Sequence, residues 1–109
     1  MMLCMKHHNL VYLAQAAECL KVLAHPKRLE IITILRDHES LSVGEIAERC
    51  ELLQHVTSEH LRLMQRCGFL SSRREGKFCF YQIQETHVLE ILDCIETKFK
   101  KKGKVKNAK

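Results

Sequence analysis

The spacing of apolar residues changes twice along this chain of 109 residues, and these changes restrict the folds open to it. Up to about residue 67, apolar residues recur every three or four positions, which is typical of amphipathic helices. Residues 70–83 have the pattern of two short strands around the turn Glu75-Gly76, and helical spacing returns from residue 85. The sequence therefore predicts one mostly α-helical domain with a β-hairpin before its last helix.

Local signals predict where the helices begin and end. Pro26 separates the first two helices, because proline fits the first turn of a helix but breaks its interior. Ser42 and Glu45 have the spacing of a capping box at the start of a short third helix. A turn then leads to a fourth helix that ends at Gly68. Two helices joined by a short turn form a helix-turn-helix, and the hairpin after it forms a wing.

Charge divides the chain into an arm (residues 1–9), the winged domain (residues 10–99) and a basic tail (residues 100–109) predicted to be disordered. The net charge is +5, but seven lysines lie after residue 97; without them, 11 basic residues face 13 acidic ones. A local excess of basic residues lies between Gln54 and Tyr81, which suggests phosphate contacts there. The tail either adds sequence-independent affinity for DNA or only improves solubility.

The six cysteines form no Cys-x-x-Cys pair, and the long amphipathic segments can build a core without disulfides. We therefore expect free thiols in a reducing, cytoplasmic compartment. No apolar stretch reaches the roughly 18 residues of a membrane span, so no membrane partner is expected. The sequence has neither a glycine-rich phosphate loop nor a nucleophile elbow, so it is not expected to be an enzyme.

The first and last helices each have a strong apolar face in a small domain. We expect these two faces to pair in a twofold homodimer. The alternative is that both faces complete the core of a monomer.

Five segments appear in an order and at a spacing that resemble the ArsR/SmtB family of bacterial winged-helix repressors, over residues 10–97. They are Leu20-Lys-Val-Leu-Ala-His-Pro-Lys-Arg-Leu-Glu-Ile-Ile, Leu41-Ser-Val-Gly-Glu-Ile-Ala-Glu-Arg, Gln54-His-Val-Thr-Ser-Glu-His-Leu, Cys67-Gly-Phe-Leu, and Arg74-Glu-Gly-Lys with Tyr81. The resemblance implies a homodimer that represses an operator and leaves it when a metal ion, metalloid or thiol oxidant acts. The chain departs from the family at Glu51, where relatives often have Gly, and at Leu53, where they often have a capping Ser or Thr.

The second helix of a helix-turn-helix reads double-stranded DNA in the major groove through its first residues. Base-edge contacts are expected from Gln54, His55, Thr57 and Ser58, because these side chains can donate and accept hydrogen bonds. Phosphate contacts are expected from Arg62 and from Arg73, Arg74 and Lys77 of the wing. The alternative for the wing is a solvated basic hairpin. His60 is expected to pack or hydrogen-bond locally instead of touching DNA.

The sensor sites that the resemblance implies are incomplete here. Ser42 and Gly44 occupy the positions of one cysteine metal site, and Thr33 occupies one position of a thiol-switch pair. Glu85 and His87 match half of a second metal site, but lysines replace its other half, which makes a metal site there weak at best. No cofactor is therefore certain.

The remaining sensor candidates are Cys19 and Cys94 in the predicted interface helices. They could respond to a thiol-reactive agent or to a thiophilic metal or metalloid inducer, or they could be small buried packing residues. The sequence thus predicts a DNA-binding repressor with a thiol-directed signal. Two alternatives stay open, namely a winged-helix regulator with no small-molecule inducer and a small thiol-rich metal-handling protein.

Overall fold

The computed structural model describes the backbone of residues 2–108 and the side chains of residues 10–99. Within these residues, helices and strands follow one another as α1 (Met2–Leu23), α2 (Pro26–Arg36), β1 (Leu41–Ser42), α3 (Val43–Cys50), α4 (Gln54–Arg66), β2 (Leu70–Glu75), β3 (Phe78–Ile83) and α5 (His87–Ala108). This order confirms the predicted winged helix-turn-helix.

The observed starts of α2 and α3 confirm the predictions made from Pro26 and from the capping box of Ser42 and Glu45. Pro26 lies in the first turn of α2, and the Nδ1 atom of His25 accepts a hydrogen bond from the backbone N–H of Lys27 at 3.1 Å. At the start of α3, the Ser42 hydroxyl accepts from the N–H of Glu45, and the Glu45 carboxylate accepts from the N–H of Ser42. These reciprocal bonds satisfy two backbone donors that a helix leaves unpaired.

The wing is part of a three-stranded antiparallel sheet with the order β1-β3-β2. β3 pairs with β2 through the hairpin, where Gly76 adopts a positive φ of 63°. On its other side, β3 pairs with the two-residue strand β1, with Leu41 opposite Tyr81. β1 was not predicted, because two residues are too few to show a strand periodicity.

The core lies between α2, α3, α4 and the inner face of the sheet. Its fully buried side chains include Ile31, Ile46, Leu61 and Met64, all from positions with helical apolar spacing. Val88 and Leu92 at the start of α5 also join this core, which anchors that helix to the domain.

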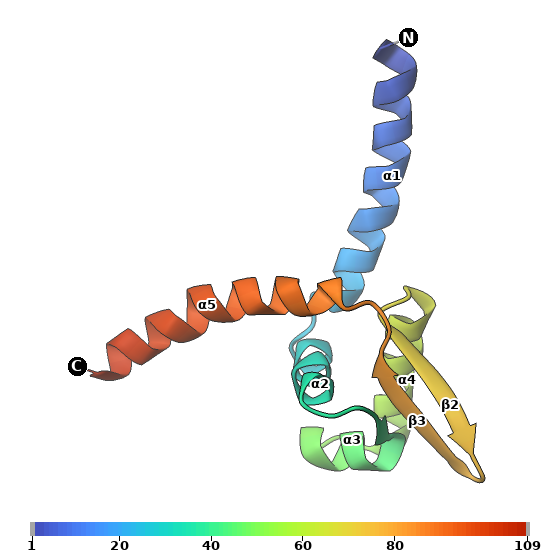
Figure 1. Ribbon diagram of the computed structural model, residues 1–109, viewed down its shortest axis with the longest axis vertical. Helices are drawn as coiled ribbons and strands as arrows, with labels where there is room; N and C mark the ends of the chain where they lie inside the picture. The colour runs from blue at the N-terminus through green and yellow to red at the C-terminus, as the bar shows by residue number, and fades with distance from the viewer. Residues whose placement is uncertain (1, 109) are drawn as a thin grey trace.

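Helices α1 and α5 project away from the rest of the domain in different directions (Figure 1). α1 begins at Met2 rather than near Leu10, and α5 continues to Ala108 rather than ending near Phe99. Lysine is a good helix former, so its run prolongs α5 where a lack of apolar residues had suggested disorder. The side chains of the predicted arm and tail, including the tail lysines, lie outside the described residues. In the described part of the chain, no helix is long and apolar enough to cross a membrane.

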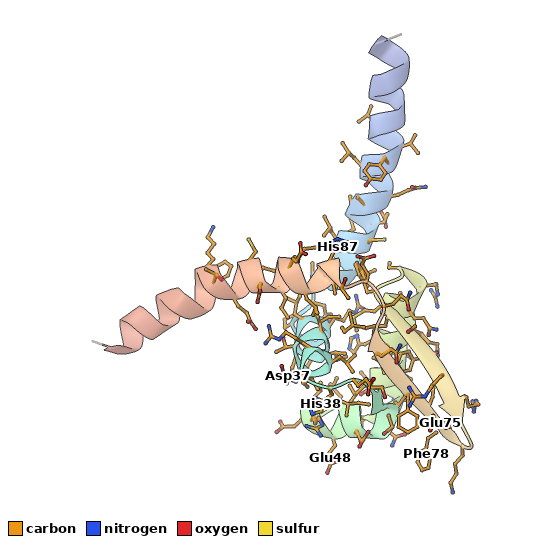
Figure 2. The ribbon with its side chains drawn as sticks, in the orientation of Figure 1. Asp37, His38, Glu48, Glu75, Phe78 and His87 are labelled. Carbon is orange, nitrogen blue, oxygen red and sulfur yellow. The ribbon has the colours of Figure 1, made fainter. Side chains whose placement is uncertain are left out.

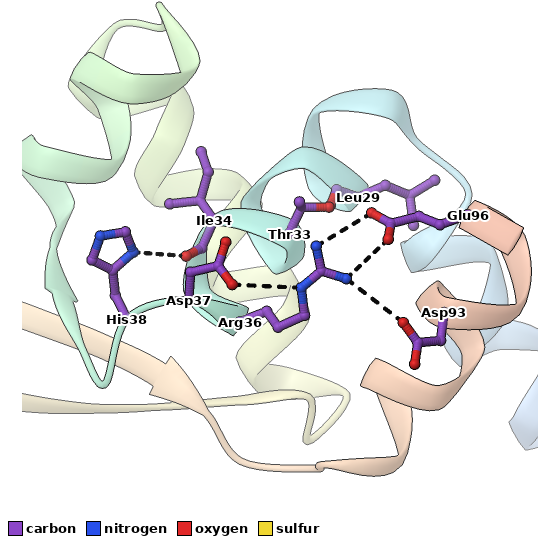
Figure 3. A network of polar contacts seen from close by, with 8 residues as sticks. All are labelled: Leu29, Thr33, Ile34, Arg36, Asp37, His38, Asp93 and Glu96. Atoms are coloured by element: carbon purple, nitrogen blue, oxygen red, sulfur yellow. Dashed lines mark hydrogen bonds and ion pairs between the residues drawn. The ribbon is translucent and has the colours of Figure 1, made fainter. Parts of the chain in front are cut away.

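Arg36 ties α2 to α5 (Figure 3). Its guanidinium donates to the Glu96 carboxylate at 3.1 and 3.4 Å and lies 3.9 Å from Asp93, also on α5. Asp37 approaches the same guanidinium at 3.8 Å. The hydrogen bond to Glu96 is the main reason that the pKa of Arg36 is raised. These contacts hold the first part of α5 against the domain.

Candidate functional site

The exposed side of α4 carries most of the predicted base-reading residues. Gln54, His55 and Arg62 are exposed and Ser58 is half-buried. The helix starts at Leu53, which makes no side-chain capping bond, as its apolar side chain predicts. The first turn of α4 therefore presents polar side chains and backbone N–H groups on the exposed side of the domain.

The prediction for Thr57 was wrong. Its side chain is fully buried, and its hydroxyl donates to the carbonyl oxygen of Leu53 at 3.0 Å. Three residues along a helix fall about 60° short of a full turn, so Thr57 lies on a different side of α4 from Gln54, and that side faces the core. Ser58, four residues after Gln54, lies on nearly the same side as Gln54. Thr57 packs inside the domain and satisfies its hydroxyl locally, so it does not contact DNA.

A groove of about 310 Å³ lies between the starts of α3 and α4 and the tip of the wing. It brings together three of the predicted DNA-contacting residues, Gln54, Ser58 and Lys77. Other lining residues are Ser42, Val43, Gly44, Phe78 and Cys79. The groove places hydrogen-bonding groups from α4 opposite a cation from the wing.

Five of the lining residues were not predicted as DNA contacts from the sequence, and two of them, Gly44 and Phe78, shape the groove. Gly44 lies so close to Gln54 that a Cβ atom on it would stand 3.1 Å from the Gln54 Nε2 atom. Phe78 is 55% exposed at the tip of the wing (Figure 2). An aromatic residue directly after the hairpin turn could have signalled an exposed wing tip, but the approach of Gly44 to Gln54 depends on the tertiary packing of α3 against α4.

Arg73 and Arg74 lie on opposite faces of the wing. Arg73 donates to the Glu75 carboxylate at 2.7 Å and to the Ser40 hydroxyl at 3.4 Å, and its guanidinium lies 5.1 Å from the centre of the Phe80 ring. Arg74 is exposed and stands opposite Cys79 in the ladder, so it shares the face of the hairpin that carries Cys79. Arg74 therefore lies on the same face as the groove residue Cys79, whereas Arg73 is already engaged on the opposite face.

His60 has a structural role, as predicted. Its Nδ1 atom accepts a hydrogen bond from Arg28 Nε at 3.0 Å, and its ring lies 4.8 Å from that of His25. Burial lowers the pKa of His60, and the nearby Arg28 and His25 lower it further. A neutral His60 therefore joins α4 to α2.

The thiols occupy two different settings. Cys94 is exposed on α5 and lines an apolar hollow of about 530 Å³ with Ile91, Ile95 and Phe99. Cys19 is half-buried at the end of α1, near Cys67, and the two thiols interact. The sequence groups Cys19 with Cys94 as sensor candidates and does not single out Cys67.

Glu85 and His87 engage each other at the start of α5. The Glu85 carboxylate accepts from the backbone N–H of His87 at 3.2 Å and also contacts the His87 ring. This contact raises the pKa of His87 and lowers that of Glu85. The described residues contain no group of three or more His, Cys, Asp or Glu side chains that could hold a metal ion.

Residues 23–73 match a family model described as a helix-turn-helix domain. The chain is 38% identical over 82 residues to the transcriptional activator HlyU of Vibrio cholerae, an alignment that covers 75% of each chain. A solved structure of HlyU from Vibrio cholerae superposes with a TM-score of 0.70 at 35% identity and covers 79% of this chain and 92% of that one.

Two further solved structures are similar. One is the homodimeric winged helix-turn-helix DNA-binding domain of Mb0332 from Mycobacterium bovis, a possible ArsR-family regulator, with a TM-score of 0.71, 26% identity and 80% of each chain covered. The other is the transcriptional repressor PagR of Bacillus anthracis, with a TM-score of 0.68, 34% identity, and 78% of this chain and 97% of that one covered.

Proposed function

This chain belongs to the ArsR/SmtB-type family of winged-helix transcriptional regulators, and from that membership we propose that it acts as a homodimeric, operator-binding repressor. The observation that carries the proposal is the groove in which Gln54 and Ser58 of α4 lie across from Lys77 of the wing. A helix-turn-helix regulator places this helix in the major groove, with its first turn at the base edges.

Each residue of the site has a distinct role in the proposed complex. The Gln54 amide can bond an adenine edge through two atoms, and Ser58 and His55 can donate or accept beside it. Arg62, one turn further along α4, and Arg74 and Lys77 of the wing contact phosphates. Arg73 reaches phosphate only by exchanging its bonds to Glu75 and Ser40 for that contact.

A homodimer is supported by the apolar residues that one chain leaves exposed. On α1, Leu10 and Leu13 are 64% and 57% exposed, and on α5, Ile91 and Phe99 are 41% and 63% exposed. A second copy that covered these faces would also present a second α4 to the next turn of the operator.

The DNA-binding proposal is tested by fluorescence anisotropy with the DNA upstream of the protein's own gene. We expect Gln54→Ala to weaken specific binding by about 1–3 kcal/mol, because a base-edge contact is lost. We expect Lys77→Ala to weaken binding to all sequences alike and to reduce the salt slope by about one, because a phosphate contact is lost.

Lys21→Ala is the matched control, because Lys21 is an exposed cation on α1, away from the groove. If Lys21→Ala and Lys77→Ala reduce the salt slope equally, the groove is not the side that faces DNA.

Repression is proposed because occupancy of a promoter by a dimer is sufficient for it. HlyU is named an activator and PagR a repressor, so similar chains regulate in both directions. Transcription in vitro from the upstream promoter decides the direction: we expect added protein to lower the transcript level, and a rise would contradict repression.

We also propose that a thiol-reactive agent, or a thiophilic metal or metalloid, releases the DNA. This is supported by the exposure of Cys94 on α5 and by the place of Cys19 at the end of α1. Glu85 and His87 are the weaker candidates, because they engage each other without a third ligand among the described residues.

Titration of the protein–DNA complex with peroxide, persulfide, zinc, cadmium and arsenite tests this signal. We expect at least one agent to release the DNA, and Cys19→Ser or Cys94→Ser to abolish the release. If none of them releases it, the alternative of a regulator without a small-molecule inducer is favoured. Metal retained in native mass spectrometry by a chain that does not bind DNA would favour a metal-handling protein.

A further inference from the structure

Two cysteines that are far apart in the sequence meet where α1 packs against α4. α1 packs against α4, and there the thiol of Cys67 interacts with that of Cys19. Both side chains are half-buried and pack against the hydrophobic core.

The position of each thiol is well defined by its element. On α1, Cys19 shares the inward side with Val22 and Leu23, whereas the apolar residues Leu13 and Leu20 are exposed on other sides of the helix. The Cys19 thiol therefore faces its own chain and not the proposed dimer interface. Cys67 is the C-terminal cap of α4, and its N–H donates to the carbonyl oxygen of Leu63 at 3.2 Å.

The surroundings of Cys67 favour its protonated thiol in the reduced protein. Burial raises the pKa of the Cys67 thiol, and the adjacent Cys19 raises it further. The guanidiniums of Arg66 and Arg28 act in the opposite direction and favour the thiolate. The charges of Arg66 and Arg28 are thus placed to stabilise the Cys67 thiolate that forms during oxidation.

We propose that Cys19 and Cys67 are a redox-active pair that closes into a disulfide between α1 and the end of α4 when a peroxide oxidises it. One thiolate sulfur attacks a peroxide oxygen, which breaks the O–O bond, forms a sulfenic acid and releases one water after protonation. The sulfur of the second cysteine then attacks the sulfenic sulfur, forms the S–S bond and releases a second water. Two thiols lose two electrons and two protons, and one hydrogen peroxide is reduced to two waters.

The consequence for DNA binding rests on the proposed function. α1 carries a face of the proposed dimer, and α4 carries the proposed DNA-reading residues. The position of α4 relative to the dimer interface sets the distance between the two α4 helices on the operator. A disulfide between α1 and α4 therefore acts on that distance. The S–S bond brings the sulfurs to about 2 Å and moves the end of α4 relative to α1. We expect the oxidised protein to bind its operator about tenfold more weakly, within the usual range of coupling between two sites.

Peptide mapping of the full-length protein after treatment with hydrogen peroxide, without reduction, tests the pair directly. Trypsin releases Cys19 within residues 7–21 and Cys67 within residues 67–73. We expect these two peptides to be joined in the wild type and in Cys94→Ser, and dithiothreitol to separate them. Cys19→Ser and Cys67→Ser should each abolish the joined peptide, and their unchanged circular dichroism and thermal transition should show that both variants fold.

Anisotropy with operator DNA on the same samples tests the coupling. We expect oxidation to weaken binding by the wild type and by Cys94→Ser but not by Cys19→Ser. The pair is overturned if Cys19 and Cys67 stay reduced or if each links mainly to another cysteine, and the coupling is overturned if the joined protein binds DNA unchanged. A reduced protein that does not bind DNA contradicts the proposed function instead, and the joined peptide still decides the pair.

Discussion

Glu51 ends α3 in a backbone conformation that glycine adopts most readily. Its φ and ψ are 56° and 49°, and it is the only residue other than glycine with a positive φ among those the structure describes. The conformation is needed because the N–H groups of Glu51 and Leu52 must bond back to carbonyls of α3 while the chain turns toward α4. The helix-turn-helix turn therefore contains a local strain that arises from a Cβ atom.

This strain predicts the effect of a single substitution. We expect Glu51→Gly to raise the free energy of unfolding by about 1 kcal/mol, because it removes the Cβ clash of the left-handed region. Chemical denaturation checks the value. Glu51→Ala is the matched control, since it keeps the Cβ atom; a gain as large for alanine as for glycine would place the cause in the lost carboxylate instead.

His60 predicts how the stability of the domain depends on pH. Because its pKa is lowered in the folded protein, the unfolded chain binds the proton more tightly. Its contribution to stability is complete above pH 6.5, the ordinary pKa of histidine, and is lost as the pH falls through the lower folded pKa. We expect His60→Asn, which keeps an acceptor for Arg28, to flatten the loss of stability between about pH 7 and pH 5.

Denaturation midpoints across this range check the prediction. His87 serves as the contrasting variant, because its raised pKa makes a contribution of opposite sign, present below pH 6.5 and lost as the pH rises. If His60→Asn loses as much stability between about pH 7 and pH 5 as the wild type, another group is responsible for the loss.

At the scale of the elements, some polar side chains hydrogen-bond within the domain, and others stay exposed at the proposed DNA-binding groove. The α4 helix uses Thr57 and His60 to attach itself to the domain and leaves Gln54 and Ser58 at the groove. The wing does the same with its arginines, holding Arg73 through Glu75. A basic or polar residue in these elements is therefore available to DNA only if its face of the element is open.

At the scale of the whole molecule, the exposed apolar faces of α1 and α5 predict an obligate dimer. We expect Leu13→Glu or Ile91→Glu to raise the dimer dissociation constant at least tenfold, because burial of one such side chain contributes about 1.5–3 kcal/mol and the twofold axis repeats each loss. Sedimentation velocity across protein concentrations measures the change.

Phe78→Glu is the matched control for the dimer. It places the same charge on an exposed apolar position, but on the wing instead of α1 or α5. If all three variants dissociate alike, or if the wild type is a monomer at every concentration, the two faces do not form the proposed interface.

The sequence by itself determined the kind, the order and most of the boundaries of the elements. Apolar periodicity, Pro26, the capping box from Ser42 to Glu45 and the glycines at helix and hairpin ends act over about four residues, so they can be read without knowing what packs where. The same information predicts the region of the proposed recognition surface, because the first turn of the second helix and the basic hairpin are local features.

Only the tertiary structure decided which residues of that region face outward and which distant residues meet. It buried Thr57, set Arg73 apart from Arg74, added β1 to the sheet and placed Cys19 against Cys67. Each outcome depends on how one element packs on another: Arg73 also reaches Ser40, and Leu41 pairs with Tyr81. Local spacing cannot specify such contacts, since the same helix or strand can turn either face to the core until its neighbours are in place.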